Sequence, residues 1–494
     1  MRKLPESVAG LGPLRKHEAT GRTSGTSKLL SGIDAAISAC GLKNGDTISF
    51  HHHLRNGDAV LNTVVAALAR RGLKDLHLAV SSIFPVHAPL VDHIRNGTVT
   101  RISASFIAGP VGEAVSRGAL HQPVILRSHG GRARALDTGD LPVDVAFVAA
   151  SAADELGNLS GRIGHSPFGT MGYPLADVES ARHVVAVTDS VVPYPAVPID
   201  IPQHKVDFVA PVDSIGDAAG IASGTTRPAA DSVSLGIAER TAAVIAASGL
   251  LVEGFSFQTG AGGISLATAA AVGQEMTQRG ISGSFASGGI TGFHVEMLRA
   301  GLFRNLMDVQ CFDLDAVRSY QSDPRHQSMS AAAYAGPHVG GAVVDRLSAV
   351  VLGAAEVDLD FNVNVTTRAD GLIIGGAGGH SDTAQGARLT LITTRLTAAG
   401  HAKIVPEVGT LTTPGETVDA VITEAGIAVN PLREDLRDRL ETAGLPVLSI
   451  QDMQARASEA ASHPPARRST GRVVAVSEYR DGSVTDVIRQ VEED

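Results

Sequence analysis

Short apolar segments alternate with amphipathic or Ala-rich ones along most of the chain. The pattern predicts helices over 33–39 and 59–71 and strands over 47–50, 76–80, 124–126, 143–148, 184–187 and 473–476. Short β-branched strands separated by helices are typical of a mostly parallel sheet that is covered on both faces. The predicted fold class is therefore α/β.

One segment reads as a connection between domains. Residues 217–231 are rich in Gly, Ala, Thr and Pro and poor in large apolar residues. We therefore predict an irregular N-terminal arm over 1–27, a first domain over 28–230 and a second domain over 231–494. Within the second domain, residues 458–470 are predicted to form a surface loop.

Two pairs of similar segments, one in each predicted domain, favour a duplicated architecture. Ser49-Phe50, a Gly-containing loop, an apolar helix and Arg71-Gly72 correspond in spacing to Ser256-Phe257, a Gly loop, an apolar helix and Arg279-Gly280. Later, 142–146 is echoed by 416–421, and each opens an apolar strand. The two domains are thus expected to share one architecture.

Composition narrows the class of protein. The 494 residues are 44% apolar and 19% charged, which is a globular balance. The net charge is −10, aromatic residues make up 4% and Trp is absent, so a nucleic-acid partner is not expected. No apolar run reaches the ~18–20 residues of a membrane span, and the N-terminus lacks the apolar run of a secretory signal. A cytoplasmic protein without membrane contact is expected.

The two cysteines argue against a disulfide framework. Cys40 and Cys311 are far apart, and neither belongs to a CxxC pair. Both are expected to be buried, and neither a thiolate metal site nor any other metal site is predicted.

The first candidate site follows the predicted strand 124–126. Arg127-Ser128-His129-Gly130-Gly131-Arg132 brings guanidinium groups and an imidazole beside two glycines at a strand end, where ligands gather in parallel sheets. Such a loop could hold a polycarboxylate by charge-assisted hydrogen bonds. The alternative is a solvated basic loop or an ion pair at the end of the sheet.

The second candidate is His51-His52-His53-Leu54-Arg55, which leads from a strand toward a helix. Anion binding near the helix start is plausible. Three adjacent histidines resemble a metal site, but neighbouring side chains of an extended segment point to opposite faces, so metal is the weaker interpretation. The nearby Asp58 could simply cap the helix.

Three glycine loops in the second domain form the third candidate. Each follows a β-prone stretch and precedes a predicted helix, so backbone N–H groups would gather at the sheet ends and could stabilise an oxyanion. A single loop of this kind usually makes only a tight turn. The predicted donors are Gly260, Gly262, Gly263, Gly288, Gly289, Gly378 and Gly379.

Other known loop signatures are not met. The sequence contains neither GxxxxGK[ST] nor HExxH, which argues against a P-loop nucleotide hydrolase and a zinc helix. The stretch from Gly260 reads GxGGxS instead of GxGxxG, so the dinucleotide fingerprint is not met either.

Taken together, several segments resemble citrate lyase α subunits, and the resemblance covers nearly the whole chain. These segments are HHHLRNGD (51–58), GPVGEAVSRG (109–118), RSHGGRARA (127–135), FQTGAGG (257–263), GGITG (288–292), FNVNVTT (361–367), GGAGGHSDTAQGA (375–387) and TEAGIAVNP (423–431).

The resemblance implies two tandem lobes similar to CoA transferases, with the active site between them. It implies a citrate CoA-transferase that exchanges acetyl for citryl on a thioester carrier within an oligomeric citrate lyase complex. The expected partners are a lyase β subunit and an acyl-carrier γ subunit, with citrate and acetate as small molecules. The co-substrate would be the carrier's CoA-derived phosphopantetheine arm, or acetyl-CoA, and no cofactor would be bound covalently to this chain.

One departure from the wider CoA-transferase superfamily concerns the nucleophile. Many members carry a glutamate in a Ser-Glu-Asn-Gly stretch, whereas Ser287-Gly288-Gly289-Ile290 has no carboxylate. We therefore predict no covalent nucleophile. A citrate carboxylate would attack the acetyl thioester directly and form a mixed anhydride, which the released thiolate would then attack. Positioning of the two reactants would supply much of the rate.

The residue assignments follow from this mechanism. Citrate would be bound by Arg127, Ser128, His129 and Arg132, together with His52 and Arg55. Asp382 could orient His380 or a loop amide, or could merely cap the helix that follows. A citramalate lyase α subunit and a catalytically silent scaffold subunit of the same complex remain as alternatives. Any Mg²⁺ requirement would belong to a cleavage step in another subunit.

Overall fold

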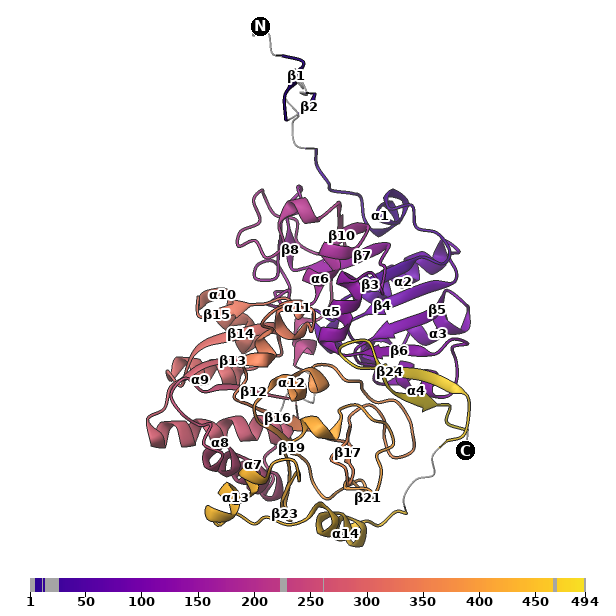
Figure 1. Ribbon diagram of the computed structural model, residues 1–494. Coiled ribbons are helices and arrows are strands. Elements are labelled where there is room, and N and C mark those ends of the chain that lie inside the picture. Colours follow the sequence, from indigo (N-terminus) through magenta and orange to yellow (C-terminus); the bar gives the residue numbers. More distant parts are fainter. Residues whose placement is uncertain are drawn as a thin grey trace.

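Two large, mostly parallel sheets frame the protein, and each lies in its own lobe (Figure 1). The structure is a computed structural model that describes residues 5–10, 12–13, 26–222, 229–260, 262–464 and 469–492. Most of the predicted N-terminal arm, 14–25, and the middle of the predicted connection, 223–228, lie outside the described residues. The predicted α/β class is confirmed.

The first sheet has nine strands, and the neighbouring strands are parallel except for the last pair. In spatial order they are β11 (Phe208–Pro211), β10 (His183–Thr188), β7 (Val145–Ala150), β3 (Thr47–Phe50), β4 (Leu76–Val80), β5 (Val99–Ala104), β6 (Val124–Arg127), β24 (Val473–Glu478) and β25 (Val484–Arg489).

The C-terminal strands differ from the predicted domain division. β24 pairs in parallel with β6, with Ala475 opposite Val124, so the chain returns from the second lobe to finish the first sheet. The prediction that 231–494 forms one domain therefore does not describe the last strands. The edge of β6 is covered by β24 and β25, which lie more than 300 residues later in the sequence.

The second sheet has eight strands and the same general plan, with one antiparallel edge pair. In spatial order they are β15 (His326–Ser328), β14 (Phe303–Cys311), β13 (Gly283–Ile290), β12 (Ser256–Thr259), β16 (Ala349–Gly353), β19 (Thr390–Thr393), β22 (Ala420–Thr423) and β23 (Gly426–Val429).

The apolar positions of the helices recur every three or four residues. This spacing gives each helix an apolar face, which packs on a sheet. In α2, for example, Leu61, Val64, Val65 and Leu68 are all buried. First-lobe helices are α1 (Ile33–Ala39), α2 (Val60–Arg70), α3 (Leu90–Arg95), α4 (Pro110–Ser116), α5 (His129–Asp137) and α6 (Pro174–Ser180). Second-lobe helices are α7 (Ser232–Ala247), α8 (Gly263–Arg279), α9 (Gly292–Arg299), α10 (Leu314–Ser322), α11 (Ala331–Ala335), α12 (His380–Gly386), α13 (Glu434–Thr442) and α14 (Ile450–Ala460).

The remaining described strands form short antiparallel pairs. They are β1 (Ser7–Val8) with β2 (Gly12–Pro13), β8 (Ala152–Ala153) with β9 (Leu159–Ser160), β17 (Glu356–Val357) with β18 (Val363–Asn364), and β20 (Thr397–Ala398) with β21 (His401–Ala402).

The duplication is visible in the sheets, although only one predicted echo aligns with it. Ser49-Phe50 and Ser256-Phe257 lie on β3 and β12, which occupy corresponding central places. The predicted correspondence between 142–146 and 416–421 is wrong. These segments lead into β7 and β22, and β7 adjoins β3 whereas β22 lies three strands from β12.

A better match joins the turns after β7 and β16. The Asp154 carboxylate accepts hydrogen bonds from the backbone and side chain of Asn158, and Asp358 does the same for Asn362. The same turn chemistry therefore occurs at the same place in both lobes.

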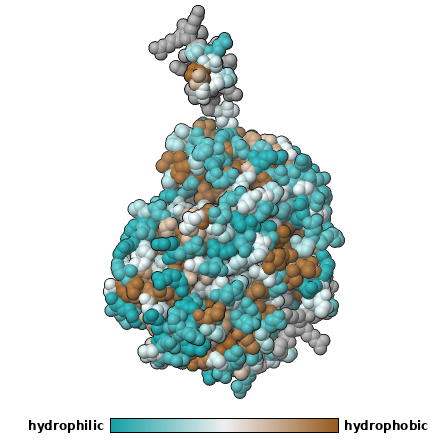
Figure 2. Space-filling model, in the orientation of Figure 1, coloured by the Kyte–Doolittle hydropathy of each residue, from teal (hydrophilic) through white to brown (hydrophobic). Residues whose placement is uncertain are grey.

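The surface that faces the viewer in Figure 2 is mostly hydrophilic, with apolar residues in separate patches. Among the described residues, no helix combines the length and the apolar composition that a membrane crossing requires.

Candidate active site

Two loops that are 250 residues apart in sequence meet where the lobes touch. Ser128 Oγ donates a hydrogen bond to Asp382 Oδ1 at 2.8 Å, and the Gly130 amide donates to Asp382 Oδ2 at 2.9 Å. Burial raises the pKa of Asp382 to about 6, and these hydrogen bonds together with the nearby Arg480 oppose the rise. Asp382 of the second lobe therefore holds the start of α5 in the first lobe.

The loop before α12 approaches the same place through its backbone. The His129 amide donates to the carbonyl of Gly378 at 2.7 Å. A methyl group at Gly130 would lie 2.0 Å from the Ala335 carbonyl oxygen, so the close approach of the lobes requires glycine there. The predicted RSHGG and GGAGGH loops are thus brought together.

The other two glycine loops join this centre through one glutamine. Gln258, on β12, donates from Nε2 to the Tyr334 hydroxyl at 2.7 Å and accepts at Oε1 from Ser287 Oγ at 3.0 Å. A methyl group at Gly379 would lie 2.6 Å from that tyrosine hydroxyl, and one at Gly288 would meet Gln258. All three glycine loops therefore converge on Tyr334 and Gln258.

Two of the predicted oxyanion donors are already used within the chain. The Gly260 amide donates to the Val351 carbonyl at 2.8 Å, and the Gly378 amide donates to the Ser105 carbonyl at 3.1 Å. An amide bonded in this way cannot also serve an oxyanion without losing its partner. By contrast, the first residues of a helix have amides without intrahelical partners, and this is where Gly262, Gly263 and Gly379 lie.

The two arginines of the RSHGG loop are engaged in ion pairs. Arg127 forms a two-point pair with Glu478 of β24, at 2.7 and 3.2 Å. Arg132 forms one with Asp177 of α6, at 2.9 and 2.7 Å, where both side chains are buried. Both guanidinium groups thus take part in ion pairs at the end of the sheet, while Arg127 Nη1 and Arg132 Nε have no hydrogen-bond partner among the described residues. Citrate binding by these two arginines stays a prediction.

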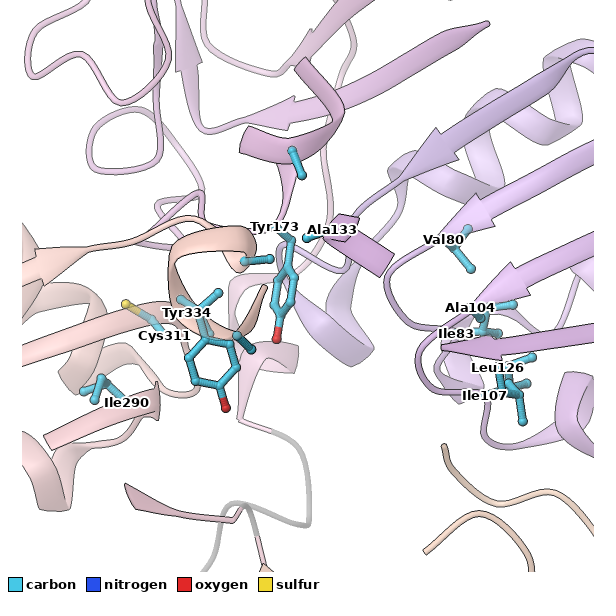
Figure 3. Packing of buried hydrophobic residues seen from close by; sticks show 14 of the residues in the cluster. Val80, Ile83, Ala104, Ile107, Leu126, Ala133, Tyr173, Ile290, Cys311 and Tyr334 are labelled. Carbon is cyan, nitrogen blue, oxygen red and sulfur yellow. The ribbon is translucent and has the colours of Figure 1, made fainter. Parts of the chain in front are cut away.

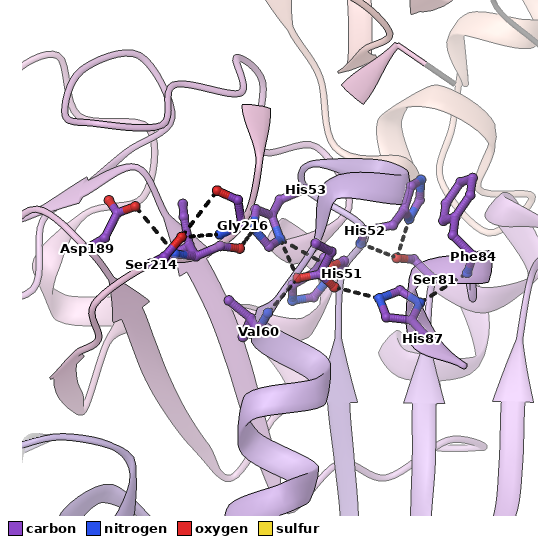
Figure 4. Close-up of polar contacts among 12 residues, drawn as sticks. His51, His52, His53, Val60, Ser81, Phe84, His87, Asp189, Ser214 and Gly216 are labelled. Atoms are coloured by element: carbon purple, nitrogen blue, oxygen red, sulfur yellow. Dashed lines mark hydrogen bonds and ion pairs between the residues drawn. The ribbon is translucent and has the colours of Figure 1, made fainter. Parts of the chain in front are cut away.

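Of the three adjacent histidines, His52 and His53 have separate hydrogen-bond partners (Figure 4). His52 Nδ1 lies 2.6 Å from Ser81 Oγ, His53 Nε2 lies 3.0 Å from the Ile215 carbonyl, and His51 Nδ1 lies 3.7 Å from Asp177. Burial lowers the pKa of His51 to about 4 and that of His52 well below its usual value. His51 and His52 are therefore neutral at physiological pH.

The positively charged side chain of Arg55 lies at the boundary of the lobes. Its backbone adopts a positive φ of 53°, and its guanidinium lies 4.0 Å from the ring centre of Phe312 in the second lobe. Gly289 backs the same ring, because a methyl group there would lie 2.2 Å from it. Burial lowers the pKa of Arg55 to about 10, so the side chain stays protonated at neutral pH.

His380 faces away from Asp382. Its Nδ1 lies 2.7 Å from Thr413 Oγ1 and its Nε2 lies 2.9 Å from the Gly353 carbonyl. Of the two roles predicted for Asp382, the structure thus shows the one toward a loop amide, that of Gly130, and not the one toward His380.

Asp308, Cys311 and His326 lie close enough to hold a metal ion. They also satisfy one another: the Cys311 thiol and His326 Nε2 lie 3.1 and 3.0 Å from Asp308 Oδ2. Burial raises the pKa of Cys311 well above its usual value, whereas metal binding requires a thiolate. Mutual hydrogen bonding accounts for this cluster.

Two cavities differ in their relation to the glycine loops. A hollow of about 10 Å³ is lined by His51, His52, His53, Tyr173 and Gln310 among others, which is room for about one water molecule. A larger cavity of about 440 Å³ lies between the second lobe and β25, and none of the predicted site residues lines it.

Comparisons with known proteins agree with this geometry. A family model described as "Citrate lyase, alpha subunit (CitF)" matches residues 26–491. The chain belongs to the family of citrate lyase α subunits. The citrate lyase alpha chain of Klebsiella pneumoniae is 46% identical over 464 residues, which cover 94% of this chain and 91% of that protein.

Solved structures extend the citrate lyase α comparison. A Streptococcus mutans structure, described as the α subunit of citrate lyase in complex with citrate, has a TM-score of 0.93 and 44% identity and covers 98% of this chain and 96% of its own. A 4-hydroxybutyrate CoA-transferase from Porphyromonas gingivalis, at 19% identity and a TM-score of 0.55, covers 87% of this chain and 96% of its own and shares the fold. The predicted enzyme class, the citrate CoA-transferase chain of a citrate lyase complex, is confirmed at the level of the family.

Some residues of this citrate lyase α chain escaped the sequence prediction. Tyr173, Gln258, Gln310 and Tyr334 all lie at the junction of the lobes. Gln310 Nε2 donates to the His52 carbonyl at 2.6 Å, and Tyr173 and Tyr334 lie side by side (Figure 3). A single glutamine or tyrosine in an apolar stretch carries no spacing signal, so only the neighbouring glycine loops could have drawn attention to them.

Proposed function

We propose that this chain transfers a carrier thiol from acetate to citrate, converting acetyl carrier and citrate into citryl carrier and acetate. The observation that carries the proposal is the convergence of the three glycine loops and the RSHGG loop at the junction of the lobes. The citrate in the Streptococcus mutans relative supports the choice of substrate.

The proposed step begins when a citrate carboxylate oxygen attacks the acetyl thioester carbon. The carbon–sulfur bond breaks, the carrier leaves as a thiolate, and a mixed acetyl–citryl anhydride remains. The thiolate then attacks the citryl carbonyl, and acetate leaves with the bridging oxygen. Amides at the helix starts, those of Gly262, Gly263 and Gly379, are placed to stabilise the developing oxyanion.

The carboxylates around the site support direct attack. Asp382 accepts from Ser128 and Gly130, and Glu478 is paired with Arg127. A carboxylate held in this way is a poor nucleophile. Positive charge for citrate would come from Arg55, with Ser128, His52 and His129 beside it, while the carrier arm would be a CoA-derived phosphopantetheine.

The proposed partners are a lyase β subunit and an acyl-carrier γ subunit. A test uses the complete complex and a single turnover with citrate that carries oxygen-18 in its carboxylates. Direct attack delivers one labelled oxygen to the acetate of that first turnover. Unlabelled first-turnover acetate, or a glutamyl adduct trapped with borohydride, would replace direct attack by a covalent enzyme.

The same assay separates the alternatives. Faster exchange with citramalate than with citrate would identify a citramalate lyase chain. A complex that assembles but exchanges no acetate in the presence of either acid would identify a scaffold.

A further inference from the structure

Tyr173 stands at the centre of the junction between the lobes. Its ring contacts the His52 and His129 rings, at centre-to-centre distances of 4.8 and 4.7 Å. The residue starts α6 in the first lobe, and Tyr334 of α11 in the second lobe lies beside it (Figure 3). The two histidine rings and Pro174 after it restrict the movement of the phenol.

The hydroxyl of Tyr173 donates to no acceptor in the part of the chain that the structure describes, although the residue is only 6% exposed. A phenol in a largely buried side chain that forms no hydrogen bond with the described residues is available to a ligand. The neighbouring His129 Nδ1 is likewise buried and without a partner among the described residues. Two adjacent polar groups therefore have no hydrogen-bond partner among the described residues.

The charge around Tyr173 indicates what that ligand is. Arg55 is the nearby cation, while burial lowers the pKa of His129 to about 3 and that of His52 well below its usual value, so both rings are neutral. Burial raises the pKa of Tyr173 well above its usual value, which keeps the phenol a donor at neutral pH. One guanidinium and one fixed phenol match a carboxylate, which accepts hydrogen bonds and carries a single negative charge.

We propose that the Tyr173 hydroxyl donates a hydrogen bond to a carboxylate of the substrate and thereby positions it at the transfer centre. The inference rests on the proposed function and adds a residue and a contact to it. Tyr173 contributes only this hydrogen bond, and no covalent bond to Tyr173 forms or breaks.

The decisive variant is Tyr173→Phe, which keeps the ring contacts with the two histidines and removes only the hydroxyl. We expect the KM for citrate in the complete complex to rise on the order of 10- to 100-fold, because a hydrogen bond to a charged group is lost. The midpoint of thermal unfolding should stay unchanged, since the hydroxyl forms no hydrogen bond with the described residues that could be lost. A role that is only structural would show the opposite pair of results.

Tyr320→Phe is the matched control. The Tyr320 hydroxyl, on α10, donates to Asp200 at 2.7 Å, and we expect its loss to leave the KM for citrate unchanged. The chain has five tyrosines and no tryptophan, so citrate binding can also be read from the tyrosine difference spectrum. We expect that spectrum to be lost in Tyr173→Phe and kept in Tyr320→Phe.

The outcomes separate this inference from the proposed function. If the wild-type complex exchanges no acetate with citrate, the proposed function fails, and the difference spectrum still tests whether Tyr173 contacts a carboxylate. If wild type exchanges normally and Tyr173→Phe keeps both its KM and its spectrum, the role of Tyr173 is overturned while the function stands.

Discussion

Glu478 and Arg127 form a two-point ion pair that joins the C-terminal hairpin to the strand leading into the site, with N–O distances of 2.7 and 3.2 Å. Their side chains are 7% and 15% exposed, for Arg127 and Glu478 respectively. The pair ties together two segments that are 351 residues apart in sequence. It therefore adds a side-chain contact to the backbone pairing that holds β24 on β6.

Replacing Arg127 by Met should destabilise the protein by about 3 kcal/mol, because it leaves the Glu478 carboxylate buried without its partner. Denaturation in urea measures the change. Replacing both residues by Met should restore much of the loss, whereas Arg318→Met, which breaks an exposed pair with Asp315, should change stability far less. A double variant that is no more stable than the single one would show that the pair itself is not the cause.

A second prediction concerns the close approach at Gly130. Alanine there would place its methyl carbon 2.0 Å from the Ala335 carbonyl oxygen, and backbone cannot yield as a flexible side chain does. We expect Gly130→Ala to cost more than about 2 kcal/mol and to abolish exchange activity. Gly236→Ala, inside α7 with no neighbour within 4 Å, should instead stabilise the protein by about 0.5–1 kcal/mol. Equal effects at the two sites would contradict the clash.

The sequence predicted elements well where one local pattern determined them. The strands at Thr47–Phe50 and Leu76–Val80 and the helix at Ile33–Ala39 occur with the predicted bounds, since each is a short buried run between clear turn residues. The glycine loops were found because clustered glycines are rare outside turns and binding loops. Local chemistry thus located the loops of the site.

Contacts between distant segments were beyond a local pattern. The partners of Arg127 and Arg132, Glu478 and Asp177, could not be predicted because they lie on elements whose position depends on the whole fold. Asp382 bonds across 252 residues to Gly130, and no spacing rule connects the two. Tyr173 looks in sequence like an ordinary core residue, and only its missing partner among the described residues distinguishes it.

The two thiols provide a third prediction. Burial raises the pKa of Cys40 to about 12 and that of Cys311 well above its usual value, so neither forms a thiolate at neutral pH. A disulfide reagent should therefore label neither cysteine in the native protein and both after unfolding in urea. Because Cys311 Sγ lies 2.3 Å from where a methyl group at Gly169 would be, slow native labelling there would report separation of the lobes. Rapid native labelling of Cys311 would mean that the interface is open.

The last prediction follows from the raised pKa of Asp382. Its pKa is about 6 in the folded protein against 3.8 in the unfolded chain, so the folded state holds the proton more tightly. The stabilising effect of this proton is complete below pH 3.8 and is lost as the pH rises through about 6. Asp382→Asn removes the titration but can still accept from the Gly130 amide through its oxygen and donate to Ser128.

The stability of wild type relative to Asp382→Asn should therefore fall on the order of 2–3 kcal/mol between pH 4 and pH 7. Urea denaturation of both proteins at several pH values measures this difference, and other titrating groups cancel because the two chains share them. A difference that is flat across this range would show that the carboxyl at the junction titrates normally. A rise with pH would mean that the hydrogen bonds from Ser128 and Gly130 to the Asp382 carboxylate outweigh the cost of burying its charge. The ionised carboxylate would then hold the lobes together.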